Sequence, residues 1–253
     1  MSLNNLNLKN YNYIFIEEVD YENIEMMLRN NLVGLCWGTE NEDCYDISDV
    51  IDEFLDRFFR KSEEQQFGYI GEFLYYLYIL NNDDIISPVS IFFNQEEKAF
   101  KKGFDLLGYD GSELWYSEVK SCEKKGNDID AVNLERLSTA YRDIKDKLKF
   151  INRNTNYWDT AKSNICKIKT NGIISDRKNI VDILTADRAK ENIKNVIIVS
   201  VIFDNSNVDL DEQKIKEKYD NIKSQRENIT IVCIRKKTID KIIEIIKGVR
   251  TDE

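Results

Sequence analysis

The sequence contains no histidine among its 253 residues. Histidine is the side chain most often used as a general base near neutral pH, and it completes the serine and cysteine catalytic arrangements. Its absence excludes Ser-His-Asp and Cys-His catalysis, the histidine-metal nuclease motifs and the HExxH proteases. Any hydrolysis by this chain must therefore depend on carboxylates, lysine and a metal ion.

Cysteine is sparse and shows neither a metal-binding nor a disulfide pattern. The residues are odd in number and scattered, without a Cys-x-x-Cys spacing: Cys36, Cys44, Cys122, Cys166 and Cys233. This arrangement predicts neither a disulfide framework nor a zinc finger. We expect buried free thiols instead.

Long apolar runs are also missing. No stretch has the length needed to cross a bilayer, and no signal peptide is evident, so we expect a soluble cytoplasmic protein with no membrane association. The chain is 42% hydrophobic, which is enough for the core of one large domain or two small ones.

Positive charge is scarce in the N-terminal quarter. Residues 1–56 contain 13 acidic and 2 basic residues, whereas the remaining 197 contain 33 and 34. The net charge of −10 argues against indiscriminate coating of DNA, but residues 98–178 contain 17 basic against 12 acidic residues. A basic rim around carboxylates suits a metal-dependent nuclease, although solvated helix faces give similar counts. The acidic segment is either a solvated face, which we favour, or a surface that engages a basic partner or covers a DNA site until activation.

The stretch from Lys101 to Cys122 has the pattern of a β-hairpin. An extended run begins at Phe104, a turn is expected over Gly108–Gly111, and a second run spans Leu114 to Ser121. An Asp-Gly pair between two apolar runs favours such a turn, because glycine accepts the positive φ that a tight turn requires.

Charged side chains are expected to converge on one face of this hairpin. Side chains alternate along a strand, so Glu118 and Lys120 share the face of Leu114 and Tyr116. If the hairpin loop has an even number of residues, Asp105 pairs with Leu114 or Tyr116 and its side chain points to the same face. Buried charges must pair or bind a cation, and two carboxylates from different strands suit Mg²⁺, which keeps several waters. The alternative is a structural salt-bridge network in an ordinary α/β protein.

These three residues follow the pattern D-(x)n-E-x-K. On the segments KGFD and SEVK, and on the preceding helix GEFLYYLYI, the chain resembles the PD-(D/E)XK nucleases. It is similar to the HamA subunit of the Hachiman anti-phage defence system, from about Ser62 onward. The order of helix, strand, hairpin and helix adds specificity to a pattern that is frequent by chance. Two departures are that no Pro-Asp precedes the hairpin and that the first sixty residues match nothing in the generic nuclease core.

The resemblance implies a Mg²⁺- or Mn²⁺-dependent DNA endonuclease that acts as a defence effector. It implies Asp105, Glu118 and Glu72 as metal ligands and Lys120 as the residue that positions or helps to deprotonate the attacking water. It further implies a HamB-type helicase partner that holds the nuclease in check until infection. The alternative function is a catalytically inactive nuclease-like module that binds DNA or serves as an adaptor.

Glu72 is the only charged residue between Gln65 and Asn82. It falls in a helix that we expect from Ser62, where Ser62 and Gln65 have the spacing of a capping box, to about Leu80. An acid on a covered helix face requires a partner. That partner is either a metal ion or, equally, a tyrosine hydroxyl or a lysine.

Basic residues beside the hairpin are candidates for DNA contacts. Lys101 and Lys102 precede it, and Lys124 and Lys125 follow it. The helix expected over Ile129–Phe150 has a basic outer face that could track a nucleic-acid backbone or be an ordinary solvated surface; its members are Arg136, Arg142, Lys145, Lys147 and Lys149.

The expected fold is α/β, a mixed central β-sheet flanked by helices, with a restriction-endonuclease-like core and an N-terminal αβ extension. Residues 1–60 are expected to form an acidic αβ element packed on the core. Residues 61–253 are expected to form the nuclease-like domain with a C-terminal αβα extension. Besides the hairpin, strands are expected at 10–16, 85–93, 195–203 and 229–234; further helices are expected at 21–30, 48–60, 179–192, 210–226 and 238–247.

Overall fold

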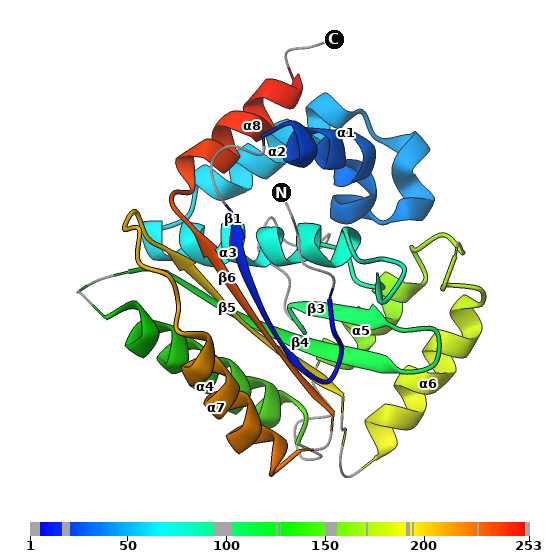
Figure 1. Ribbon diagram of the computed structural model, residues 1–253. Coiled ribbons are helices and arrows are strands. Elements are labelled where there is room, and N and C mark those ends of the chain that lie inside the picture. The colour runs from blue at the N-terminus through cyan, green and yellow to red at the C-terminus, as the bar shows by residue number, and fades with distance from the viewer. Residues whose placement is uncertain are drawn as a thin grey trace.

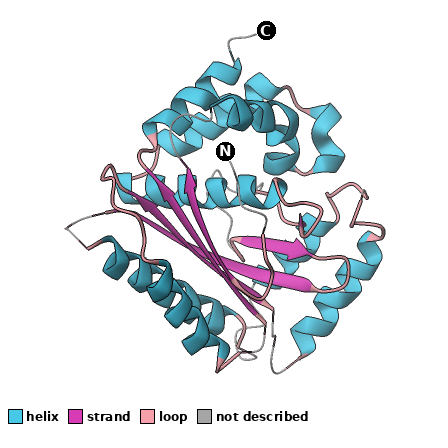
Figure 2. Ribbon diagram, viewed as in Figure 1, coloured by secondary structure: helices cyan, strands magenta, loops and turns pink. Residues whose placement is uncertain are grey.

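A six-stranded mixed sheet forms the centre of the molecule, in the order β1-β6-β5-β4-β3-β2. The computed structural model describes residues 6–16, 21–93, 103–124, 126, 128–149, 156–170, 172–190, 193, 195–226 and 228–250. Four strands run parallel: β1 (Tyr11–Ile16), β6 (Ile229–Lys236), β5 (Val196–Phe203) and β4 (Leu114–Glu123). Antiparallel β3 (Leu106–Tyr109) and β2 (Ser87–Pro88) complete it. The mixed sheet flanked by helices is confirmed (Figure 2).

Helices cover both faces of this sheet (Figure 1). One face carries α3 (Glu63–Leu80), and beyond it lie α1 (Tyr21–Trp37), α2 (Ile47–Phe59) and α8 (Asp240–Arg250). The other face carries α4 (Ile129–Lys147), α5 (Asn156–Ile165), α6 (Arg177–Ala189) and α7 (Glu212–Lys223). Every residue of β5 is buried, which explains its continuous Val/Ile run, because parallel strands covered on both faces have no solvent side.

Helix α3 lies between the sheet and a second layer of helices, so it is apolar nearly all round. Ser62 and Gln65 form the expected capping box. The Tyr75 hydroxyl lies 2.9 Å from Ser117 Oγ in β4, and the Tyr76 hydroxyl lies 2.7 Å from Ser90 Oγ, which also accepts from the backbone N–H of Leu107 at 3.0 Å. These bonds fix the helix against the hairpin.

The N-terminal elements differ in detail from the sequence-based expectation. Strand β1 pairs with β6, so residues 11–16 belong to the same sheet as the rest of the chain. Helix α1 is continuous to Trp37, instead of ending near Asn30, because the buried stripe continues through Leu32 and Leu35. Helix α2 begins at Ile47, one residue before the expected start, because the side chain of Asp46 caps it and accepts from the Ser48 N–H at 2.8 Å. An additional 3-10 helix, η1 (Thr39–Cys44), joins α1 to α2.

The segment 85–93 is mostly not the strand that its apolar composition predicted. Only Ser87 and Pro88 join the sheet, at its β2 edge, where proline's missing N–H is tolerated. Farther on, the N–H groups of Phe92 and Phe93 donate to the carbonyls of Leu35 and Cys36 at 2.8 and 3.2 Å. The segment therefore leaves the sheet because it satisfies the last carbonyls of α1.

All five cysteines are free, as expected, but only Cys36 and Cys233 are buried, whereas Cys44 and Cys166 are exposed. Among the helices that the structure describes, none combines the length and the apolar character that a membrane span would require.

Candidate active site

The hairpin turn lies two residues later than the sequence suggested. Tyr109 pairs with Leu114, so the loop is Asp110–Glu113. Asp110 organises it: Oδ1 accepts from the backbone N–H groups of Ser112 and Glu113 at 2.9 and 2.7 Å, and Gly111 adopts φ of 93°. The predicted turn over 108–111 is therefore wrong, because the aspartate side chain makes a longer turn favourable.

This turn sets the register that brings two carboxylates together. Leu106 pairs with Ser117, and the same register places Asp105 opposite Glu118. The expected pairing of Asp105 with Leu114 or Tyr116 is therefore wrong. The shift is by an even number of residues, so Asp105 still shares a face with Glu118.

Asp105 is held at the point where β3 stops and β4 continues. The β3 ladder ends at Leu106, whereas β4 runs on to Glu123. Beyond that point the backbone N–H of Val119 donates to Asp105 Oδ2 at 2.7 Å. The carboxylate thus replaces a ladder partner and satisfies a donor on an otherwise open strand edge.

Glu118 lies beside Asp105 and is almost fully buried, with 2% of its side chain exposed. Two lysines compensate its charge. Lys120 Nζ lies 2.8 Å from Oε1, and Lys147 Nζ lies 2.5 Å from Oε2. Lys120 also bonds to Asp143 Oδ2 of α4 at 3.0 Å.

Lys147 is the site residue that the sequence analysis placed wrongly. It was assigned to the outer face of its helix, but its ammonium also lies 3.5 Å from Asp105 Oδ1 and 3.0 Å from the Gly103 carbonyl oxygen. The buried positions Leu137, Ala140 and Ile144 lead at helical spacing to residues 147 and 148. That stripe was the signal that Lys147 borders the buried face.

Glu72 reaches the same cleft from α3. The cleft has a volume of about 550 Å³ and is lined by residues of α3, α4, α5 and β4 and by Asp105: Glu72, Asp105, Glu118, Val119, Lys120, Asp143, Asp146, Lys147 and Tyr157. The sequence-predicted residues Asp105, Glu118, Lys120 and Glu72 therefore all line one cleft. Asp143, Asp146, Lys147 and Tyr157 are additional.

The electrostatics follow from burial and from mutual proximity. Burial, reinforced by the Asp105 charge, raises the pKa of Glu118 to about 7, although Lys147 and Lys120 act in the opposite direction. Burial alone would lower the pKa of Lys147, but the charges of Asp105 and Glu118 raise it above its ordinary value. The pKa of Lys120 is also raised, since Glu118, Asp105 and Asp143 outweigh its burial.

The donor set fits a hard, hydrated cation. Asp105 and Glu118 offer carboxylate oxygens from adjacent strands, and Mg²⁺ needs only one or two carboxylates because it retains water. In the described part of the chain no three or more His, Cys, Asp or Glu side chains are placed so that together they could hold a metal ion. The position between the two carboxylates is instead the one that the Lys147 ammonium contacts.

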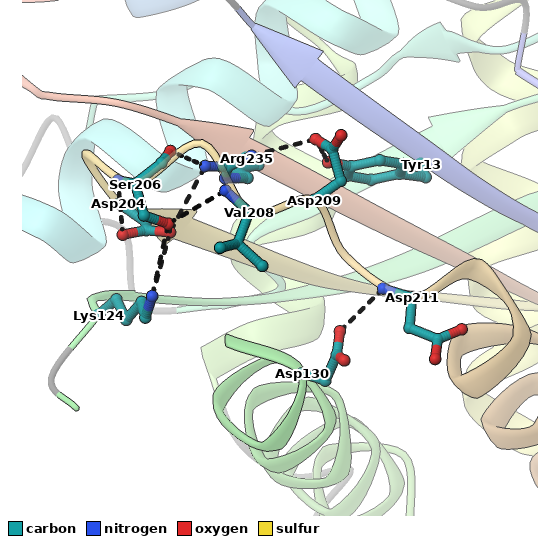
Figure 3. Close-up of polar contacts among 9 residues, drawn as sticks. All are labelled: Tyr13, Lys124, Asp130, Asp204, Ser206, Val208, Asp209, Asp211 and Arg235. Carbon is teal, nitrogen blue, oxygen red and sulfur yellow. Dashed lines mark hydrogen bonds and ion pairs between the residues drawn. The ribbon is translucent and has the colours of Figure 1, made fainter. Parts of the chain in front are cut away.

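The predicted DNA contacts are only partly described. Lys101, Lys102 and Lys125 lie outside the described residues. Lys124 does not line the cleft; its ammonium lies 3.5 Å from both Asp204 Oδ2 and Ser206 Oγ, with 8% of the side chain exposed (Figure 3). Arg235, 1% exposed, shares Asp204 and also bonds to Asp209 at 3.1 Å.

The acidic N-terminal segment contacts basic residues of the chain itself. Glu40 pairs with Arg177 at 2.7 Å, and Glu42 pairs with Lys169 at 3.0 Å. The backbone N–H of Lys169 also donates to Thr39 Oγ1 at 2.6 Å. None of the residues of η1 is buried, as expected for a solvated face. The helix nevertheless packs against the basic region that follows α5.

Together these features define an α/β protein with a polar cleft in which carboxylates and lysines from a central strand and two covering helices converge. The HamA family model matches residues 2–247, and the chain belongs to the HamA family. This confirms the similarity to HamA, which extends over residues 2–247 and does not begin only at about Ser62, and identifies a component of the Hachiman anti-phage defence system. A search of curated proteins and a search of solved structures gave no match.

Proposed function

We propose that this protein is a metal-dependent DNA endonuclease with a PD-(D/E)XK-type site, the effector of a Hachiman system that acts in the cytoplasm with a HamB-type helicase partner. The observation that carries the proposal is the meeting of Asp105, Glu118 and Lys120 in one cleft, with Glu118 Oε1 2.8 Å from the Lys120 ammonium. Family membership supports the defence role.

Each residue has a distinct part in this proposal. Asp105 and Glu118, with Glu72 from the opposite helix, would hold Mg²⁺ or Mn²⁺. The bound ion would supply Lewis acidity at the phosphoryl oxygen and lower the pKa of water. Lys120 orients the attacking water and neutralises charge that develops on the phosphate. Asp143 holds the Lys120 ammonium on the cleft side of β4.

One observation favours a second candidate, the inactive nuclease-like module that binds DNA or serves as an adaptor. Glu118 is already compensated by two ammonium groups of this chain, so these charges also satisfy one another without a metal. Such a protein would keep the cleft as a structural network.

Cleavage assays separate the two candidates. Supercoiled plasmid and linear duplex are incubated with Mg²⁺, the purified partner and either the wild type or Lys120→Ala. We expect wild-type cleavage and a loss on the order of 10²-fold or more in Lys120→Ala, since the residue acts in the chemical step. Lys216→Ala, at an exposed position of α7 that does not line the cleft, serves as the control. Equal cleavage by the wild type and Lys120→Ala would refute the catalytic assignment.

A further inference from the structure

The oxygen atoms around the Lys147 ammonium resemble the surroundings of a bound cation. Glu118 Oε2 lies at 2.5 Å, the Gly103 carbonyl oxygen at 3.0 Å and Asp105 Oδ1 at 3.5 Å. These oxygens come from three residues on the two arms of the hairpin. The ammonium arrives from α4, on the covering layer, with 19% of its side chain exposed.

The other oxygen of each of these two carboxylates has a different partner. Glu118 Oε1 accepts from Lys120, and Asp105 Oδ2 accepts from the backbone N–H of Val119. The remaining oxygens, Oε2 and Oδ1, both face Lys147. Asp105 and Glu118 would hold a divalent ion through these oxygens, and the Lys147 ammonium could not then stay at hydrogen-bond distance from both.

From this geometry we propose that Lys147 is a built-in competitor for the divalent cation. Its ammonium occupies the position between Asp105 and Glu118, and the metal binds when the ammonium leaves. This inference rests on the proposed metal-dependent function and adds to it a positioning residue whose displacement precedes assembly of the active site.

Lys147 is placed so that it can leave. It is the last residue of α4, and its flexible four-carbon stem carries a compact charge. The ring of Tyr157, also in the cleft, has its centroid 5.9 Å from Nζ, which offers the displaced ammonium a cation–π contact. A phosphate group of DNA in the cleft would further favour the displaced position, because the ammonium then meets an anion there. Lys120, by contrast, is retained by Asp143 as well as Glu118.

Mn²⁺ affinity tests the competition without any measurement of activity. Binding to the full-length protein is followed by electron paramagnetic resonance at pH 8, without DNA. We expect Lys147→Met to bind Mn²⁺ at least about tenfold more tightly than the wild type, because a like charge is removed from the site. Lys147→Arg, which retains the charge, should gain nothing. Lys145→Met is the matched control from the exposed face of the same helix and should stay within about twofold.

A measurement on the wild type avoids any loss of folding in the variant. The amine of Lys147 should react faster with an acetylating reagent when Mn²⁺ is present, as quantified by mass spectrometry, because the ammonium leaves its ion pair. Lys145 should show no such change. Unchanged reactivity of Lys147 in a protein that binds Mn²⁺ would overturn the proposal.

The outcomes distinguish this inference from the proposed function. If Asp105→Asn and Glu118→Gln abolish Mn²⁺ binding but a folded Lys147→Met binds no more tightly than the wild type, the competitor role fails and the metal site stands. If neither the wild type nor Lys147→Met binds Mn²⁺, both the competitor role and the metal-dependent function fail.

Discussion

Gly71 of α3 lies directly over Ser121 of β4: a Cβ atom at Gly71 would come within 1.8 Å of Ser121 Oγ. Only glycine permits this approach, and the next residue along the helix is Glu72, which thereby reaches the cleft at the edge of β4. The contact between helix and strand therefore determines how far Glu72 extends into the site.

Substitution of Gly71 by alanine should force α3 away from the sheet. We expect a loss of about 1–3 kcal/mol in the free energy of unfolding, the usual range for overpacking, and a decrease in any activity that needs Glu72. Gly68→Ala is the matched control in the same helix, because a Cβ there meets nothing within 4 Å. It should stabilise the protein by about 0.5–1 kcal/mol. Chemical denaturation of both variants provides the measurement, and equal effects would contradict the close contact.

The raised pKa of Glu118 makes stability depend on pH. Its pKa in the folded protein is about 7, above its ordinary value of 4.5, so the folded state binds more protons between these values. The stabilising contribution of the protonated acid is therefore full below about pH 4.5 and is lost as the pH rises through 7. Relative to Glu118→Gln, the wild type should lose about 1–3 kcal/mol between pH 5 and pH 8. Denaturant titrations at the two pH values would refute the prediction if the difference stayed constant.

Two substitutions at Asp105 can separate its hydrogen bond to the Val119 N–H from its proposed binding of a metal ion. Asp105→Asn keeps an oxygen that can accept from the Val119 N–H, so stability should change by less than about 1 kcal/mol while metal binding is lost. Asp105→Ala removes that acceptor as well. It should lower the free energy of unfolding by about 1–3 kcal/mol more, which is the penalty of an unsatisfied backbone donor. Thermal unfolding and Mn²⁺ titration of both variants are the measurements. If the two variants were equally stable, the bond to Val119 would not matter.

Lys124 has competing interpretations that one substitution can resolve. The sequence predicts a DNA contact, whereas the structure places the ammonium against Asp204, beside the buried Arg235. We expect Lys124→Met to lower stability by about 1–3 kcal/mol, because a buried carboxylate loses one of its cations, and to leave DNA affinity within about twofold. Denaturation and fluorescence anisotropy with a labelled duplex are compared. A large loss of affinity at unchanged stability would support the DNA contact instead.

Much of the site was accessible from the sequence because the relevant signals are local. Alternation along a strand is enough to place Glu118 and Lys120 on one face. An even number of residues in the hairpin loop is enough to place Asp105 on the same face. The actual register was not accessible, since it depends on the hydrogen bonds that the Asp110 side chain makes within the turn. The apolar stripe of α4 indicates that Lys147 borders the buried face, but the direction of its side chain toward Asp105 and Glu118 depends on how α4 lies over the sheet, which is a tertiary property.

The fold, like the site, was predictable only where the signals are local in the sequence. The buried strands β5 and β6 and the capped helix α3 have strong local patterns and were predicted within a few residues. The segment 85–93 has an equally strong apolar pattern but mostly leaves the sheet, because the carbonyls at the end of α1 offer its N–H groups alternative partners. Local propensity cannot reveal a hydrogen-bond partner that is 57 residues away in the chain.

The two oxygens of Asp105 serve different parts of the molecule, since Oδ2 closes the edge of β4 and Oδ1 faces the cleft. The orientation of the oxygen that faces the cleft therefore depends on the direction of a backbone N–H group. A glutamate at this position would carry one more rotatable bond and could satisfy the strand edge or the cleft, but not both in the same geometry. A change in the length of this one side chain would therefore disturb the strand edge and the cleft together.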